Sequence, residues 1–261
     1  MRFGLEPRSG ETGGPRPDAP GTRGAADSLA ELGRQIESCR ACPRLVAWRE
    51  EVAATRRAAF RDEEYWGRPV SGFGDPGAPI AVVGLAPAAH GANRTGRIFT
   101  GDRSGDWLFG SMHRMGLANQ PVSVSRSDGL RLSGVWVTAA VRCAPPANRP
   151  SPDERDRCEP FLRRELDLIG PLRVLVVLGQ FAYDVTCRML GVRPRPRFGH
   201  GVIVDGPGDL SIVCSYHPSQ QNTFTGKLTE AMTDAVFAQA MDLAGLGPAM
   251  YPGGLGPGAD A

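Results

Sequence analysis

Lysine, histidine and long apolar segments are scarce in this sequence. Its 261 residues include one lysine, Lys227, four histidines, and 30 basic against 28 acidic side chains, so net charge predicts no partner. No apolar run approaches the ~18–20 residues that span a bilayer, and the N-terminal stretch has no apolar core of a secretory signal. Membrane and secreted classes are therefore excluded. We expect a soluble, cytoplasmic, monomeric protein.

Glycine and proline are concentrated at the two ends of the chain. Residues 1–26 contain ten of them, and the last fifteen residues, from Gly247, contain eight. Segments of this composition bury too little apolar surface to fold. We therefore expect a disordered extension over 1–27, one folded domain over 28–246 and a disordered tail over 247–261.

Four short apolar runs predict the core of a sheet. Each is nearly continuous and rich in β-branched residues, as in parallel strands buried on both faces. The runs are Ile80–Leu85, Val135–Val141, Val174–Leu178 and Ser211–Tyr216. Helical patterns precede and separate them, over Ser28–Ser38, Asp106–Met115, Ser151–Ile169, Phe181–Leu190 and Leu228–Leu243. This alternation predicts an α/β fold.

The loops after these strands carry most of the unusual polar residues. They span 86–102, 142–150 and 217–222. Ligands bind at the carboxyl ends of strands in open parallel sheets, so the site is expected where these loops meet. His217 directly ends the fourth strand, and Pro218 restricts its backbone. His90 lies in the first loop, whereas His113 and His200 have the pattern of structural residues.

The glycine-rich stretch Gly91–Gly96 has half of a P-loop's spacing. Arg97 and Ile98 follow it in place of the Lys and Ser/Thr of a nucleotide-binding loop, which argues against a nucleoside triphosphatase. The dinucleotide fingerprint is also missing. Either the stretch is an ordinary tight turn, or its amides and arginines bind a phosphate backbone. In the second case Arg94 or Arg97 would contact the phosphates. The loops together carry five arginines that could make binding of such a backbone salt-dependent, although Arg142 adjoins Cys143 and could serve a metal site instead: Arg94, Arg97, Arg103, Arg142 and Arg149.

Six cysteines in a chain of this class argue against a disulfide framework. Cys39 and Cys42 form a CxxC pair, and Cys143 and Cys158 supply two further thiols. Four thiolates can hold zinc or an iron–sulfur cluster, and the wide spacing of the second pair favours a [4Fe–4S] cluster. The alternative is four unrelated core cysteines. Cys187 and Cys214 have the pattern of small core residues.

Three motifs and the cysteine quartet together resemble the type-5 uracil-DNA glycosylases. The motifs are GLAPAAHGANRTGRIFTGD (84–102), VRCAPPANRP (141–150) and YHPSQQNT (216–223). The resemblance covers about residues 36–243. It implies a three-layer α/β/α sandwich with a central four-stranded parallel sheet, a [4Fe–4S] cluster and DNA as partner, single- or double-stranded. It also implies excision of uracil, and of further deaminated bases such as hypoxanthine.

The resemblance assigns a role to each site residue. Asp102 matches the catalytic carboxylate, and His217 matches the histidine that stabilises the departing base. Phe99 matches the stacking aromatic and Asn148 the recognition amide. We further predict His90, Gly84 and Ala86 at the base pocket, and Arg94, Arg97, Ser219 and Asn222 against DNA. Many members of the wider superfamily carry a carboxylate or amide directly after the first strand. Here that stretch is Pro87–Ala89, a gap that the type-5 branch shares.

Each assignment has a simpler alternative. Asp102 precedes a helical pattern and could be its N-cap, Asn148 could be a turn residue and Phe99 plain core. Two other functions also remain open. One is a metal-stabilised module that binds damaged DNA without cutting it. The other is a superfamily relative that forms a covalent adduct with DNA.

Overall fold

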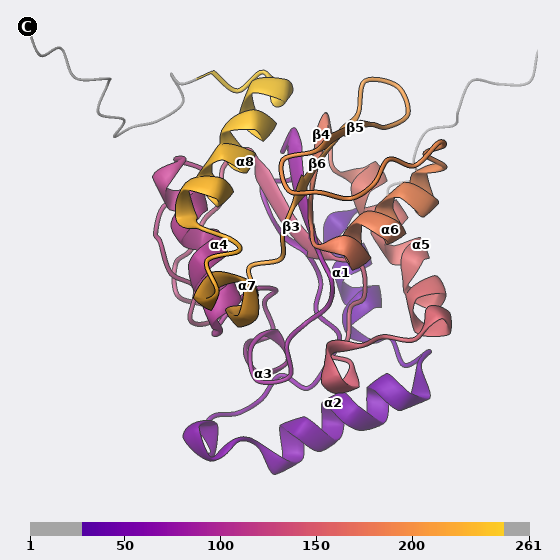
Figure 1. Ribbon diagram of the computed structural model, residues 1–261. Coiled ribbons are helices and arrows are strands. Elements are labelled where there is room, and N and C mark those ends of the chain that lie inside the picture. The colour runs from indigo at the N-terminus through magenta and orange to yellow at the C-terminus, as the bar shows by residue number, and fades with distance from the viewer. Residues whose placement is uncertain (1–27, 248–261) are drawn as a thin grey trace, which may run out of the picture.

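A computed structural model describes residues 28–247 of the chain (Figure 1). The two predicted disordered segments lie outside the described residues, except for Gly247. Six strands form one sheet in the order β1-β3-β2-β4-β6-β5. Their bounds are β1 Phe73–Gly74, β2 Ile80–Gly84, β3 Val135–Ala139, β4 Val174–Leu178, β5 Ile203–Asp205 and β6 Ser211–Ser215.

The four central strands, β3, β2, β4 and β6, are parallel, as the apolar runs predict. Val82 of β2 lies opposite Val137 on one side and Val176 on the other, and all three side chains are buried. The prediction of a four-stranded sheet is incomplete, however. Two short edge strands, β1 and β5, pair antiparallel with β3 and β6 and make the sheet mixed.

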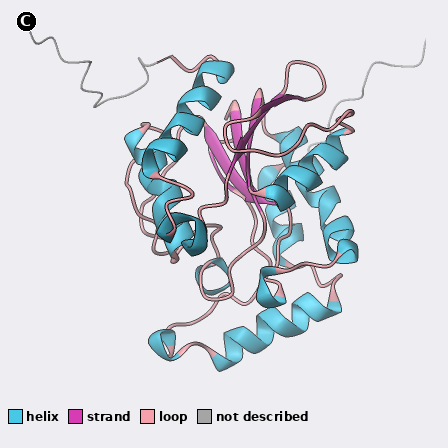
Figure 2. Cartoon of the chain, in the orientation of Figure 1, coloured by secondary structure: helices cyan, strands magenta, loops and turns pink. Residues whose placement is uncertain are grey.

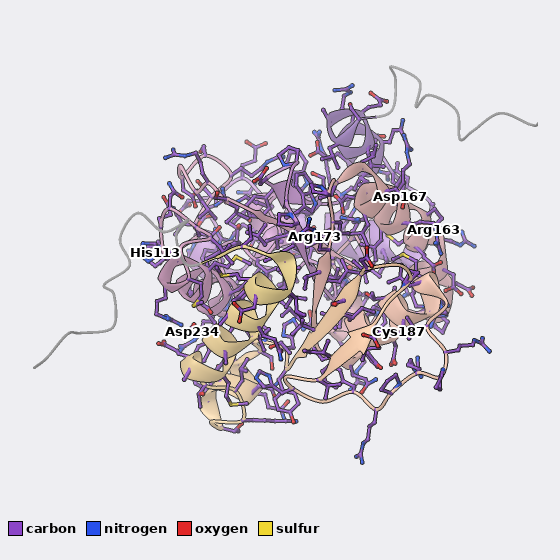
Figure 3. All side chains as sticks on the ribbon, turned by 90° about the horizontal axis from the view of Figure 1, so that it is seen from above. His113, Arg163, Asp167, Arg173, Cys187 and Asp234 are labelled. Carbon is purple, nitrogen blue, oxygen red and sulfur yellow. The ribbon has the colours of Figure 1, made fainter. Side chains whose placement is uncertain are left out.

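Helices cover both faces of this sheet, as predicted for a three-layer sandwich (Figure 2). The helices are α1 Leu29–Glu37, α2 Pro43–Thr55, α3 Ala92–Thr95, α4 Arg103–Arg114, α5 Pro152–Leu168, α6 Gln180–Leu190, α7 Gln220–Phe224 and α8 Glu230–Ala244. Figure 3 looks along the layers from above: α4 and α8, marked by His113 and Asp234, lie on one side, and α6 with Cys187 lies on the other. Short 3-10 turns occur at Ala58–Phe60 and Pro146–Asn148.

The two faces of the sheet bury separate apolar clusters. Phe109 of α4 and Phe237 of α8 pack on one face, and Leu162 of α5 and Tyr183 of α6 pack on the other. Cys187 belongs to the second cluster and is 1% exposed, in agreement with its predicted core position. No helix within residues 28–247 is both long and apolar enough to cross a bilayer.

Local signals fix where the helices around the site begin. Ser151 and Glu154 form a capping box that starts α5, with Pro152 in its first turn. Helix α4 begins three residues earlier than predicted, because the Asp102 side chain caps it and draws in Arg103–Gly105. Figure 1 shows α3, α7 and the loop before α5 at the same edge of the sheet, where the central strands end.

Candidate active site

The loops that follow β2, β3 and β6 enclose one cavity of about 560 Å³. Five of the predicted site residues line it: Ala86, Phe99, Asp102, Asn148 and His217. Ser219, one of the predicted DNA contacts, also lines it. The remaining lining residues are Leu85, Ala88, Ile98, Arg103, Ser104, Gln220 and Gln221. The parallel sheet therefore brings three segments far apart in the sequence to one binding-sized cavity.

Asp102 is at once a helix cap and a wall of this cavity. Its Oδ1 accepts the Gly105 N–H at 3.0 Å, which makes it the N-cap of α4. Burial raises the pKa of the Asp102 carboxyl, and the backbone N–H groups of Gly105 and Ser104 only partly oppose that shift. Asp102 is therefore the N-cap of α4 and still lines the cavity, so the capping role does not exclude the proposed catalytic role.

The backbone of the first loop lies directly against Asp102. A Cβ atom at Gly91 would come within 2.0 Å of Asp102 Oδ2, so no larger residue fits there without moving the carboxylate. Gly91 thus belongs to the site as the surface that backs the carboxylate. The sequence marks Gly91 as the first residue of the glycine-rich stretch, but it does not show that Asp102 packs against it.

Phe99 lies on the cavity wall with its ring 7% exposed. Its φ is 52°, which is unfavourable for a bulky side chain. Phe99 also belongs to the apolar cluster that packs with α4 and α8, so the plain-core alternative describes its packing, while its place on the wall makes it part of the cavity as well. Gly84, predicted in the base pocket, lies behind this ring and not on the wall. A Cβ at Gly84 would approach Phe99 Cζ to 2.6 Å, so the glycine provides the room that the ring occupies.

His217 lines the cavity from the segment that follows β6. Its ring centroid is 6.1 Å from that of Phe99, and within the described chain neither ring nitrogen has a hydrogen-bond partner. Burial lowers the pKa of the His217 imidazole to about 4, so the ring is neutral near pH 7. Asn222 is not in the cavity wall: its side-chain amide donates to the His217 carbonyl at 2.9 Å and fixes the backbone there. Ser219 caps α7.

Asn148 reaches the cavity from the loop before α5. Its φ is 54° and that of Ala147 is 52°, a pair of left-handed residues of which only Asn adopts this conformation readily. In residues 28–247 the Asn148 side-chain amide has no hydrogen-bond partner, so its donor and acceptor are free to meet a ligand. The turn alternative is thus correct for the backbone, while the side chain still faces the cavity.

His90 does not line the cavity. Its Nδ1 is 3.1 Å from the Tyr65 hydroxyl, which itself accepts the Arg57 N–H at 3.4 Å. Tyr65 therefore ties His90 to the segment after α2, on the side of the first loop away from the cavity wall. Tyr65 has no local sequence signal, because its partner lies 25 residues away.

Three of the five loop arginines point into the protein, which revises their prediction as DNA contacts. Arg94 is 8% exposed and pairs with Glu63. Arg97 is 7% exposed and pairs with Asp128 at 2.6 Å. Burial would raise the pKa of Asp128, but hydrogen bonds from Arg97 and backbone N–H groups lower it to about 2. The Arg97 guanidinium is thus committed to a buried carboxylate and to hydroxyl oxygens, and that of Arg94 to the exposed carboxylate of Glu63 and to main-chain oxygens.

Arg142 is the third inward arginine, while the other two remain exposed. Arg142 Nη2 is 2.6 Å from Glu165 Oε2, and both side chains are 2% exposed. Arg103 and Arg149 are exposed, and neither forms an ion pair within the described residues. Arg103 lies on the cavity wall with its guanidinium carbon 4.4 Å from the ring centroid of Phe224, which is 64% exposed.

The four predicted metal-ligating cysteines line a second, smaller cavity beside α2. It is bounded by Cys39, Cys42, Cys143 and Cys158 and by apolar side chains that include Leu45 and Phe161. Burial raises the pKa of the Cys143 thiol to about 11 and that of Cys158 to about 12. Four sulfurs from three distant segments around one apolar cavity match the donor set of an iron–sulfur cluster.

Hydrogen-bond donors are already directed at two of these sulfurs. The Arg142 N–H donates to Cys158 Sγ at 3.2 Å, and Arg49 Nη1 donates to Cys143 Sγ at 2.9 Å. Donors of this kind surround metal-bound thiolates. The residues present therefore fit a thiolate-ligated centre better than four unrelated core cysteines.

Several lining residues were not predicted from the sequence. Ser104 follows the α4 cap, and Gln220 and Gln221 open α7 within the motif that begins at His217. The sequence feature that could have identified them is that they adjoin the motif residues. Their side chains are ordinary surface types, so nothing in the sequence distinguishes them from solvated polar residues.

Comparisons with known proteins agree with this geometry. The family model described as "Uracil DNA glycosylase superfamily" matches residues 71–241. A type-5 uracil-DNA glycosylase of Mycobacterium bovis is 54% identical over 226 residues, 85% of this chain and 84% of the relative. Those of Mycobacterium leprae and Thermus thermophilus are 52% and 51% identical, covering 85% and 81% of this chain and 99% and 96% of the relatives. The chain belongs to the uracil-DNA glycosylase superfamily, in its type-5 branch.

Proposed function

We propose that this protein excises uracil from DNA by hydrolysing the N-glycosidic bond, the first step of base-excision repair. One observation carries the proposal: Phe99, Asp102, Asn148 and His217 all line one cavity. A base inside a duplex is out of reach of such a cavity, so the nucleotide must first be flipped out of the stack. The free amide of Asn148 and the ring of Phe99 supply the edge contact and the stacking surface that a flipped base requires.

His217 acts on the departing base. As the bond to the sugar breaks, negative charge develops on uracil, and a neutral imidazole N–H can donate to its O2. Because burial lowers the His217 pKa to about 4, the ring binds as a neutral donor, and its role does not depend on protonation above about pH 5. A preorganised donor to a developing anion contributes about 10²–10³-fold to the rate.

Asp102 acts on the sugar. The breaking bond leaves positive charge on the ring, which a carboxylate next to it stabilises, and the same carboxylate can orient or deprotonate water. Hydrogen bonding to the α4 N-terminus keeps Asp102 in a fixed direction. Because burial raises the Asp102 pKa, activity is expected to fall with acidification at a higher pH than for an ordinary aspartate.

The cysteine quartet is proposed to hold a [4Fe–4S] cluster in a structural role. Bound there, the group would link the turn before α2 to two segments much later in the chain, the start of the loop after β3 and helix α5. This loop continues to Asn148, so fixing Cys143 also fixes the direction from which the amide enters the cavity.

Release of free base from an oligonucleotide tests the activity. We expect free uracil and an abasic site from a uracil-containing strand, and hypoxanthine release at a lower rate. Single- and double-stranded substrates are assayed side by side. Tight binding without base release would instead support the DNA-binding module, and a denaturation-resistant protein–DNA species would support the adduct-forming relative.

Asn148→Ala is expected to reduce uracil excision more than hypoxanthine excision. The amide meets the base edge, where the two bases differ, whereas Asp102 and His217 act on features that both share. Single-turnover rates on the two substrates measure the selectivity. Asn148→Gly is the control for the backbone, because glycine adopts the φ of 54° without cost. If the excision rate falls with Asn148→Ala but not with Asn148→Gly, or falls equally for both bases, Asn148 serves only the conformation of its loop.

The two exposed loop arginines, Arg103 and Arg149, are the proposed phosphate contacts. Each Lys or Arg that neutralises a phosphate steepens the plot of log affinity against log salt by about 0.9 on B-DNA. Arg103→Ala and Arg149→Ala are each expected to make that slope less steep by about 0.9, the contribution of one phosphate contact. Arg131 is an exposed arginine just before β3, at the opposite edge of the sheet, so Arg131→Ala is the matched control. Equal slopes for all three variants would show that neither loop arginine contacts DNA.

A further inference from the structure

Among residues 28–247, Arg49 is the one buried arginine to which no carboxylate is hydrogen-bonded. Arg49, on α2, is 2% exposed. Its nearest carboxylate oxygen among the described residues is Glu50 Oε1, at 3.9 Å on a side chain that is 45% exposed. Glu50 is already bound by both terminal nitrogens of Arg40. A guanidinium removed from water in this way costs free energy unless an anion compensates it.

The other deeply buried arginine provides the contrast. Arg142 is also 2% exposed at its side chain, and it pairs with a carboxylate that is equally buried, Glu165, at 2.6 Å. Its charge is therefore balanced within the protein. Arg49 has the same burial without that balance, so its counter-charge must come from something else next to it.

The two hydrogen bonds that the Arg49 side chain donates both go to residues that line the cysteine cavity. Nη1 donates to Cys143 Sγ at 2.9 Å, and Nη2 donates to the Cys39 carbonyl at 3.2 Å. Nε is buried and has no partner in the described chain. A neutral thiol offers no negative charge to compensate a guanidinium, whereas a centre ligated by four thiolates does.

We infer that Arg49 is the buried counter-ion of the sulfur-ligated centre, and that its positive charge sets the stability and reduction potential of that centre. The inference rests on the [4Fe–4S] cluster proposed above. A positive charge fixed against one ligand favours the reduced, more negative form of a cluster. It also opposes loss of the cluster, because the bound thiolate-ligated centre carries negative charge next to the guanidinium, whereas the neutral thiols left after loss of iron do not. Charge and hydrogen bonds around the sulfurs are known means of tuning cluster potentials.

Three variants separate the charge from the hydrogen bond. Arg49→Gln keeps an N–H donor but removes the charge, and Arg49→Lys keeps the charge. Arg157→Gln is the matched control, since Arg157 lines the same cavity but is exposed and donates to the Ala41 carbonyl. The readouts are the ratio of reduced to oxidised cluster at fixed potentials and the half-life of visible absorbance during iron chelation, both on anaerobic full-length protein.

We expect Arg49→Gln to lower the reduced-to-oxidised ratio at least about tenfold, or about 59 mV for one electron, and to shorten the chelation half-life several-fold. Arg49→Lys and Arg157→Gln are expected to stay within about threefold of the wild type. If the cluster cannot be reduced in water, the half-lives decide. Equal values for Arg49→Gln and Arg157→Gln, or equal losses for the Gln and Lys variants, would overturn the inference. If Arg49→Gln does not fold, wild-type behaviour of Arg49→Lys supports it and cluster loss in Arg49→Lys overturns it.

Failure of the inference is distinguishable from failure of the proposals on which it rests. Iron and sulfide analysis of the wild type tests the cluster, and uracil release tests the activity. Zinc without sulfide would overturn both the cluster and the role of Arg49, whatever the activity. If the wild type contains four irons and four sulfides but the Arg49 variants change neither readout, the cluster assignment is kept and only the counter-ion role of Arg49 is rejected.

Discussion

Asp102→Ser is expected to lower the single-turnover rate of uracil excision by at least about 10²-fold while leaving the fold intact. The substitution removes the carboxylate, and positioned groups that act on protons or charge in the transition state contribute about 10²–10⁴-fold. Serine is a good N-cap, so its hydroxyl can still accept the Gly105 N–H that Asp102 accepts at 3.0 Å. Hypoxanthine excision should fall equally, because both substrates share the sugar.

Asp102→Ala serves as the comparison. It removes the carboxylate and the cap together, so it should be as inactive as the Ser variant and less stable by about 0.5–2 kcal/mol. Thermal melting measures that difference. If both variants excised uracil at near-normal rates with DNA binding intact, Asp102 would be only a cap and the catalytic assignment would be wrong.

Cys143→Ala is expected to abolish the visible absorption of the purified protein and its content of iron and sulfide. Loss of a cross-link between distant segments typically costs a few kcal/mol. For a domain of this size, each kcal/mol lost from the free energy of unfolding lowers the melting temperature by about 2–4 °C. We therefore expect the melting temperature to fall by roughly 10 °C.

Cys214→Ala is the control for this variant. Cys214 is also buried, in β6, but it belongs to the apolar cluster under α6 and not to the quartet's cavity. Its replacement should leave iron and colour unchanged and cost little stability. A Cys143→Ala protein with normal iron, or with the melting temperature of Cys214→Ala, would contradict the assignment of the quartet.

The central strands were predictable because their burial is complete. In β2, β3 and β4 every residue is buried, and such strands leave a continuous apolar run in the sequence. The edge strands leave no such run. β1 has two residues, and in β5 only the middle one of three is buried. Their existence depends on pairing with a strand distant in the sequence.

The direction of the loop arginines could not be predicted for a related reason. Arg97 and Arg94 each find their carboxylate 31 residues away, on Asp128 and Glu63, and Arg142 finds Glu165 23 residues away. Nothing local distinguishes these arginines from Arg103, which faces outward. The family motifs place four residues that line the cavity: Phe99, Asp102, Asn148 and His217. The same motifs also suggested Gly84, His90 and Asn222, which do not line it, because their positions depend, like those of Gly91 and Tyr65, on what packs against them.

The inward arginines also bear on how fast the protein finds DNA. Buried or nearby carboxylates cancel the charge of Arg94, Arg97 and Arg142, and the chain as a whole carries 30 basic and 28 acidic groups. The potential in front of the cavity is therefore weak beyond about one Debye length, roughly 8 Å in physiological salt. Without long-range attraction, we expect association with DNA at about 10⁵–10⁶ per molar per second rather than the 10⁸–10⁹ of steered encounters. Discrimination of damaged DNA would then depend on the contacts made after encounter, at the exposed arginines and in the cavity.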